Sequence, residues 1–201
     1  METSSKITRR EFVKTASVCG LGAAALSTLT MVFPNESAYA VTASDKDCRF
    51  DAHAHIQNTG DVHYFRANPT VGAEITTIGT TGKSLRMEAL GLSIAGYGSV
   101  YPDYESLRFT YRAHVQNIGW QNWVGDNVIA GTKGRSLRME AVQIQIASSL
   151  GTPTYNVFYR AHVQNLGWLP WVSNGAVAGT TGRSLRMEAL QVVVRKKGYG
   201  I

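Results

Sequence analysis

Cysteine, proline and carboxylate side chains are all scarce in this sequence of 201 residues, which holds 2 Cys, 5 Pro and 14 Asp and Glu. Cys48 is the only cysteine outside the expected export signal at 1–40, so the mature protein cannot form an intrachain disulfide. Few carboxylates argue against a glycosidase built on two of them, and no Ser-His-Asp set or nucleotide fingerprint stands out. We therefore expect a protein that is not an enzyme and needs no cofactor.

Self-similarity is what the sequence has in abundance. The segment Tyr111–Ile146 returns as Tyr159–Val194, and one constant offset relates His114 to His162 and Arg138 to Arg186. A more divergent copy precedes them. Repetition at a fixed period outranks local motifs as evidence about architecture. The expected organisation is a linker at 41–48 and a single β domain at 49–201, made of repeats 49–95, 106–146 and 156–195.

The start of the chain, at 1–40, has the features of an export signal. Thr8-Arg9-Arg10-Glu11-Phe12 is a twin-arginine signature, an apolar run follows, and Ala38-Tyr39-Ala40 is the small-x-small pattern of a cleavage site. We predict cleavage after Ala40 and a secreted or cell-surface protein that is exported folded. The alternatives are a membrane-anchoring helix and a lipid anchor at Cys19, although the run is short and rich in small residues for a stable span.

Within a copy the apolar residues recur with period two, which predicts β-strands. Tyr111, Ala113 and Val115 share one face of a strand, and the polar residues between them share the other. The closing strand changes its apolar face near Ala141, as a β-bulge or a move between packed layers would produce. No helical stripe occurs after residue 40.

Three such copies predict an all-β fold that closes with pseudo-threefold symmetry, because closure removes the open edges of separate sheets. A β-trefoil and a β-prism both satisfy this. The mixture of long wall strands with a short hairpin favours the trefoil.

The repeated pattern resembles the ChW repeat, named for clostridial hydrophobic repeats with a conserved tryptophan. The resemblance rests on His-Val-Gln-Asn-x-Gly-Trp, then Ala-Gly-Thr-x-Gly, then Arg-Met-Glu-Ala and an apolar strand. Copies two and three match along their whole length, whereas copy one has Asp61 at the tryptophan position. The resemblance implies an extracellular protein of Gram-positive-type bacteria that binds polymers or partner proteins.

Two other motifs are better explained by the repeat. Asp51-Ala-His-Ala-His55 resembles the metal motif of amidohydrolases, but that chemistry needs a far larger barrel, and His55 falls on the repeat position of His114. The turn that begins at Gly79 has the wrong glycine spacing for a phosphate loop. We expect no bound metal.

The tryptophans are the best candidates for a binding site, because flat indole faces stack on sugar rings. Trp120 and Trp168 are expected to be core residues, whereas Trp123 and Trp171 lie in loop-like stretches. The predicted ligand-binding residues are Trp123, Trp171, His114, Gln116, His162 and Gln164. The predicted structural residues of the repeat are Trp120, Trp168, Arg86, Glu88, Arg138, Glu140, Arg186 and Glu188, because an Arg and a Glu two apart on a strand can form a salt bridge.

The function expected from these features is a non-catalytic surface module that binds a polysaccharide or glycoconjugate. A protein-interaction or scaffolding module is the alternative, and a small cell-wall hydrolase is the second. The net charge of +6 fits attraction to anionic wall polymers or ordinary solubility, but it is no nucleic-acid footprint. The expected partner is thus a glycan or a surface protein. Contact with the membrane is expected only through the signal peptide before cleavage.

Overall fold

The computed structural model describes residue 48 and residues 50–65, 75–94 and 106–201. The expected signal peptide, its cleavage point after Ala40 and Cys19 lie outside these residues, as does nearly all of the expected linker. Every element in the described part of the chain is a β-strand, which confirms the all-β expectation. Among the same residues, no helix has the length and hydropathy needed to cross a membrane.

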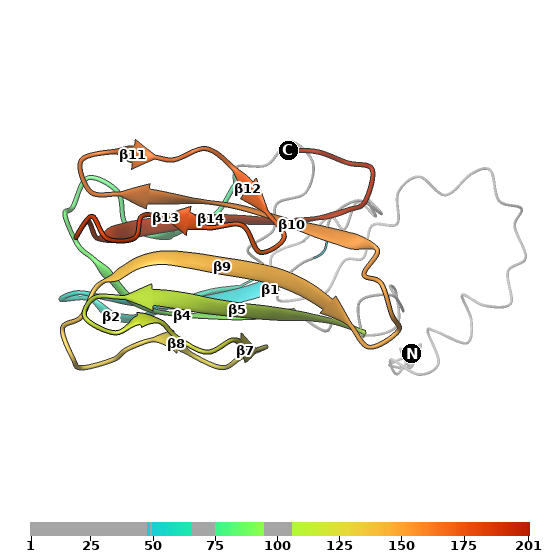
Figure 1. The fold of residues 1–201 in the computed structure, drawn as a ribbon, viewed down its shortest axis with the longest axis horizontal. Coiled ribbons are helices and arrows are strands. Elements are labelled where there is room, and N and C mark those ends of the chain that lie inside the picture. The colour runs from blue at the N-terminus through green and yellow to red at the C-terminus, as the bar shows by residue number, and fades with distance from the viewer. Residues whose placement is uncertain (1–47, 49, 66–74, 95–105) are drawn as a thin grey trace, which may run out of the picture. The chain divides into compact units, whose positions relative to one another are not determined.

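Each copy contributes two long strands that pair antiparallel with one another. Their alternation decides which side chains are buried: in one strand Tyr111, Ala113 and Val115 are fully buried, whereas Arg112 and His114 lie on the opposite, outer face. The long strands are β1 (Phe50–Ile56), β4 (Met87–Ile94), β5 (Leu107–Val115), β9 (Met139–Ser148), β10 (Tyr155–Val163) and β14 (Met187–Lys196). Figure 1 shows β10 and β14 as a layer beside β5 and β9.

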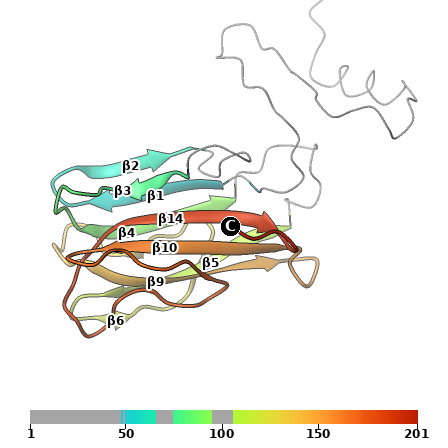
Figure 2. The same cartoon turned by 90° about the horizontal axis from the view of Figure 1, so that it is seen from above.

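Short strands complete three separate sheets, and three of them pair with a long strand of another copy. The short strands are β2 (Gly60–Tyr64), β3 (Thr77–Gly79), β6 (Gly119–Trp120), β7 (Val124–Gly125), β8 (Ala130–Gly131), β11 (Gly167–Trp168), β12 (Val172–Ser173) and β13 (Ala178–Gly179). Strand β8 pairs with β4, β13 with β9, and β3 with β14. Each copy therefore gives one strand to a neighbour and receives one from the other, which links the three copies in a ring. In Figure 2, β2 lies at the outer edge of the first sheet.

A glycine is required where an exchanged strand meets its partner. Gly131 of β8 has a φ of +102°, and a Cβ there would lie 2.3 Å from the carbonyl oxygen of Glu88. Gly79 and Gly179 hold the same position in β3 and β13, with the same conflict against the facing backbone. Only a residue without a side chain permits this approach, so the recurring Gly-Thr pair fixes where the copies exchange strands.

One hydrophobic interior is built from all three copies. The buried hydroxyl of Tyr111 in copy two accepts a hydrogen bond from the Leu92 amide of copy one at 2.9 Å, and it donates one to the Val128 carbonyl. Tyr159 of copy three repeats this arrangement with the Ile144 amide of copy two at 3.1 Å. These hydroxyls tie neighbouring sheets together inside the core, where an unpaired polar group would be costly.

A β-bulge explains the change of apolar face in the closing strands. Val115 pairs with Met139 and His114 with Ala141, which leaves Glu140 as the extra residue of β9. Because of the bulge, apolar side chains on both sides of it reach the same interior. The register breaks at the same point in β4 and β14, where Glu88 and Glu188 are the extra residues.

Candidate ligand-binding faces

The outer faces of copies two and three each carry a stack of aromatic and cationic side chains. The guanidinium carbon of Arg112 lies 4.9 Å from the ring centroid of Trp120 and 4.9 Å from that of Trp123. In copy three, the guanidinium carbon of Arg160 lies 4.9 Å from the ring centroid of Trp168 and 4.7 Å from that of Trp171. We call each set a tryptophan–arginine cradle. The two cradles have nearly the same geometry, as these distances show.

Cross-strand pairing aims the arginine of each cradle. Arg112 stands opposite Gln143 on β9, and its Nε donates a hydrogen bond of 2.7 Å to the Gln143 side-chain oxygen. Arg160 and Gln191 repeat this contact at 2.8 Å. The glutamine is itself held by the next copy, because the Gln143 amide donates to the Gly175 carbonyl at 2.6 Å. A neighbouring repeat thus helps to position the guanidinium.

A buried glutamate lies next to each cradle. The Glu140 carboxylate contacts Arg138 at 2.8 Å and the Nδ1 of His114 at 3.1 Å, and its side chain is only 7% exposed. The His114 ring meets Trp120 edge-on, with centroids 5.3 Å apart. Arg186, Glu188 and His162 form the same group in copy three. A buried carboxylate needs such partners, so the bulge residue is anchored and the histidine is held against the indole.

The structure places Trp120 and Trp168 differently from the core position expected of them. Both are half-buried and lie outside the hydrophobic core. The reason is the register: Trp120 pairs with His114, and Trp168 with His162. Directly opposed residues share a face of the sheet, so a tryptophan opposite an outward histidine also points outward.

The other predicted binding residues separate into two groups. Trp123 is 39% exposed, and Trp171 is half-buried at the same place in the other cradle. His114 and His162 lie beside the cradles. Gln116 and Gln164 follow the ends of β5 and β10, where their backbone amides donate to the carbonyls of the arginines before the bulge at 3.0 Å. The side chain of Gln164 accepts a hydrogen bond from the Arg186 amide at 3.5 Å, so it serves the strand end rather than the cradle.

A family model describes three stretches of this chain. The model, Clostridial hydrophobic W or ChW, matches residues 55–96, 114–147 and 162–196. The chain belongs to the ChW family. No curated protein and no solved structure gave a significant match.

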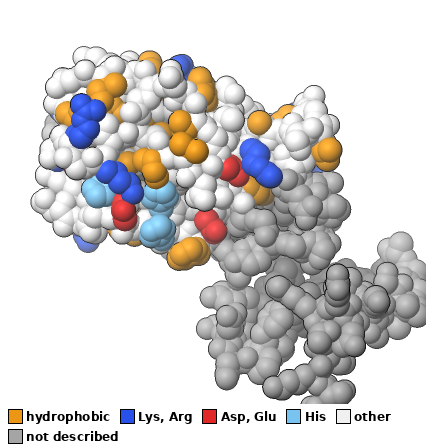
Figure 3. Space-filling view, turned by 90° about the horizontal axis from the view of Figure 1, so that it is seen from below, with side chains coloured by type: hydrophobic (Ala, Val, Ile, Leu, Met, Phe, Trp, Pro, Cys, Tyr) orange, Lys and Arg blue, Asp and Glu red, His pale blue; other side chains and the backbone are white. Residues whose placement is uncertain are grey.

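The first ChW copy lacks the cradle. His53 stands at the position of Arg112 and stacks on His63 with centroids 5.4 Å apart. Burial, followed by the charge of Lys133, lowers the pKa of His53. The glutamine position is Gly91, where a Cβ would lie 2.3 Å from the His53 ring. Figure 3 shows histidines beside acidic and basic side chains on one face. Within the described residues, no three metal-ligating side chains form a group that could hold an ion.

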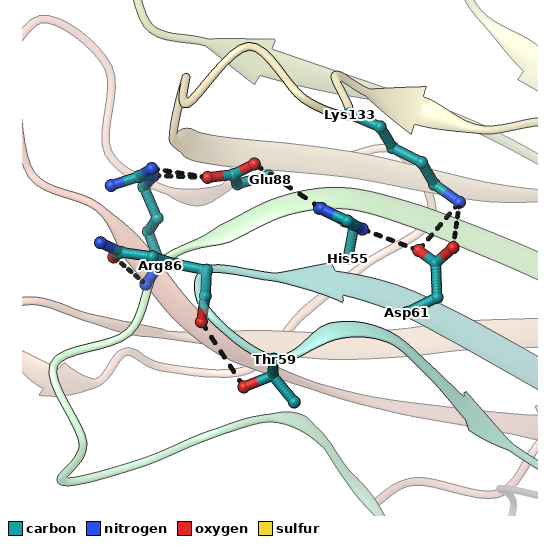
Figure 4. A network of polar contacts seen from close by, with 7 residues as sticks. His55, Thr59, Asp61, Arg86, Glu88 and Lys133 are labelled. Carbon is teal, nitrogen blue, oxygen red and sulfur yellow. Dashed lines mark hydrogen bonds and ion pairs between the residues drawn. The ribbon is translucent and has the colours of Figure 1, made fainter.

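The tryptophan of the ChW pattern is exchanged for an ion pair in the first copy. Asp61 lies 2.8 Å from the Nδ1 of His55 and 2.9 Å from the Nζ of Lys133, as Figure 4 shows. Hydrogen bonds from Lys133 and His55 lower the pKa of Asp61 to about 2. The ion-paired group behind it is retained, because Arg86 still contacts Glu88 at 2.7 Å. The first copy therefore keeps the buried glutamate and loses the cradle.

Sequence reasoning missed Arg112 and Arg160 as members of the site, along with Gln143 and Gln191. The sequence pattern could have indicated Arg112, because strand alternation already puts it on the same face as His114. What was missing was the register, which sets Gln143 of β9 opposite Arg112 and Trp120 opposite His114.

Proposed function

We propose that this ChW protein is an exported, non-catalytic module that binds a polysaccharide or glycoconjugate at the cell surface through its two cradles. The observation that carries the proposal is an internal comparison. Copy one forms the same paired long strands and the same bulge without any cradle, so the fold itself does not demand one. An aromatic stack that occurs on two outer faces, and without which the first copy forms the same strands, is best explained by binding.

The chemistry of the cradle supports a sugar ligand. Indole rings stack on the apolar faces of sugars, and the exposed part of Trp123 offers such a face. The arginine in contact with both rings restrains their orientation, so little side-chain freedom is lost when a ligand arrives. The nearby Glu140 is already committed to Arg138 and His114, which favours a binding role over an acid–base role for this face.

The test is the double variant Trp123→Ala with Trp171→Ala, assayed by pull-down on purified cell-wall sacculi and on a glycan array. We expect binding to fall below detection while the circular dichroism spectrum stays native. The matched control is Phe65→Ala, which removes an aromatic side chain that is 76% exposed in copy one and leaves both cradles intact. Retained binding by the folded double variant would reject the site.

A protein partner is the second candidate, and exposed apolar side chains favour it. Ile118 and Leu166 hold equivalent positions before the Gly-Trp pairs and are 42% and 40% exposed. Such residues are more typical of a protein contact than of a sugar site. Changing both to Ser separates the candidates: glycan binding should survive, whereas capture of a surface protein should be lost.

The export part of the proposal rests on the twin-arginine signature. Replacing Arg9 and Arg10 with Lys should leave a folded precursor inside the cell. Fractionation with an antibody against the β domain measures this. Equal amounts of the mature form outside the cell for the wild type and the variant would reject the twin-arginine route.

A further inference from the structure

Each cradle holds an arginine whose hydrogen-bonding capacity is only partly used. The Nε of Arg112 donates to Gln143, and the guanidinium carbon lies 4.9 Å from the ring centroids of both Trp120 and Trp123. Within the described part of the chain, neither Nη atom makes a hydrogen bond or an ion pair. Arg160 is in the same state, with its Nε on Gln191. The end of the guanidinium, with two parallel nitrogen donors, is left for another group.

The positive charge in each cradle also lacks a counterion among the described residues. The recurring acid beside the cradle is Glu140, and its two oxygens face Arg138 and His114. In copy three, Glu188 is committed in the same way. An arginine that is stacked, oriented by a glutamine and left unneutralised differs from an ordinary surface arginine, which is mobile or paired.

We infer that each cradle binds an anionic oxygen group of the ligand, a carboxylate or a phosphate, through the Nη atoms of Arg112 or Arg160. This inference rests on the proposed glycan-binding function and names the class of glycan as acidic. Guanidinium matches carboxylate and phosphate geometry with two parallel hydrogen bonds, and the tryptophans hold it ready to do so. The indoles then contact the sugar ring that carries the acid.

Copy one sets the number of sites. It has His53 in place of the arginine and Gly91 in place of the glutamine, so it offers no such pair of donors. The inference therefore requires two equivalent acid-binding sites in each molecule. The two sites should have similar affinities, since the two cradles present the same groups in nearly the same arrangement.

The experiment is isothermal titration of the purified protein with three probes: a galacturonic acid hexamer, the same hexamer fully methyl-esterified, and a glycerol-phosphate oligomer. We expect an acidic probe to bind with two cradles occupied and the ester to bind at least about tenfold more weakly, because one charged hydrogen-bond pair is lost per cradle. Binding of the hexamer assigns the anion to a uronate, and binding of the oligomer assigns it to a phosphate.

The variant Arg112→Gln with Arg160→Gln should remove the preference for the acidic probe. The matched control is Arg135→Gln with Arg183→Gln, which removes two equal charges from exposed turns and should change affinity less than about twofold at about 0.15 M salt. A second variant, Arg112→Lys with Arg160→Lys, keeps the charge without the pair of parallel donors and should reduce the preference for the acidic probe. It provides the answer if the glutamine variant fails to fold.

The outcomes separate this inference from the function on which it rests. Equal binding of the hexamer and its ester, unchanged in the arginine variants, would overturn the acidic class while leaving glycan binding intact. If the control variant loses as much affinity as the arginine variants, the preference reflects the overall charge of the protein. That outcome would also overturn the inference of an acidic ligand. Binding of neither glycan probe, together with no binding to sacculi, would remove the proposed function itself.

Discussion

Asp61 of copy one and Lys133 of copy two form an ion pair, with Nζ lying 2.9 Å from each carboxylate oxygen. The pair spans 72 residues of sequence and joins a strand to the turn after the exchanged strand β8. At the next boundary of the ring the same positions are Trp120 and Thr181. Two departures from the repeat pattern therefore compensate one another across a boundary between copies.

The ion pair predicts a specific titration. The hydrogen bond from Lys133 is the main cause that lowers the pKa of Asp61 from 3.8 to about 2. Because the folded pKa is depressed, the contribution to stability is present above about pH 4 and is lost as the pH falls towards 2. In Lys133→Met we expect the carboxyl pKa, followed by NMR, to move upward. Lys83→Met, at an exposed turn of copy one, should leave it unchanged. An unshifted Asp61 in Lys133→Met would contradict the assignment.

The strand exchange predicts an unequal response to two glycine substitutions. Gly131→Ala places a Cβ 2.3 Å from the Glu88 carbonyl at positive φ, so we expect a loss of about 3 kcal/mol or more in the free energy of unfolding. Gly134→Ala also has a positive φ but meets nothing within 4 Å, so about 1 kcal/mol is expected. Urea denaturation measures both. Equal losses would mean that the close approach is not the cause.

The buried tyrosine hydroxyls predict two independent losses of folding stability. Tyr111→Phe leaves the Leu92 amide and the Val128 carbonyl without the hydroxyl, which should cost about 1–3 kcal/mol. Tyr159→Phe should cost a similar amount at the next boundary, and the two should add because they share no partner. Thermal unfolding of the wild type, the single variants and the double variant tests this.

The bulge glutamate predicts a strong coupling. Arg138→Met leaves the buried Glu140 without its main cation, and the expected cost is on the order of 3 kcal/mol. Adding Glu140→Gln should recover part of that loss, because the uncompensated charge is then gone. A double-mutant cycle by chemical denaturation measures the coupling, and simple additivity of the two changes would argue against a buried ion pair.

Cys48 is predicted to be unreactive in the folded protein. It is fully buried, and burial is the first cause that raises the pKa of its thiol to about 12. In a protein starting at Val41, modification by a thiol reagent at pH 8 should follow the rate of global unfolding and accelerate in urea. Rapid labelling under native conditions, or a disulfide-linked dimer, would show an accessible thiol instead.

The sequence by itself determined the all-β class and the three copies, because both follow from patterns of residue types along the chain. Tyr111, Ala113 and Val115 are buried as their period of two predicts. The break in that period near Ala141 indicated a bulge or a change of layer, and the register of β5 and β9 decided for the bulge. The Arg-x-Glu spacing indicated the pair that Arg138 and Glu140 form. These relations involve residues close together in the sequence, so no distant partner is needed to infer them.

Only the tertiary structure decided which residues of different strands lie opposite one another. Trp120 lies outside the core because its register sets it opposite His114, and Arg112 enters the cradle because Gln143 and two tryptophans converge on it. The exchange of short strands puts Lys133 beside Asp61, although they belong to different copies. A repeat pattern is the same whether a strand pairs with its own copy or with a neighbour, so pairing between copies has to be seen in space.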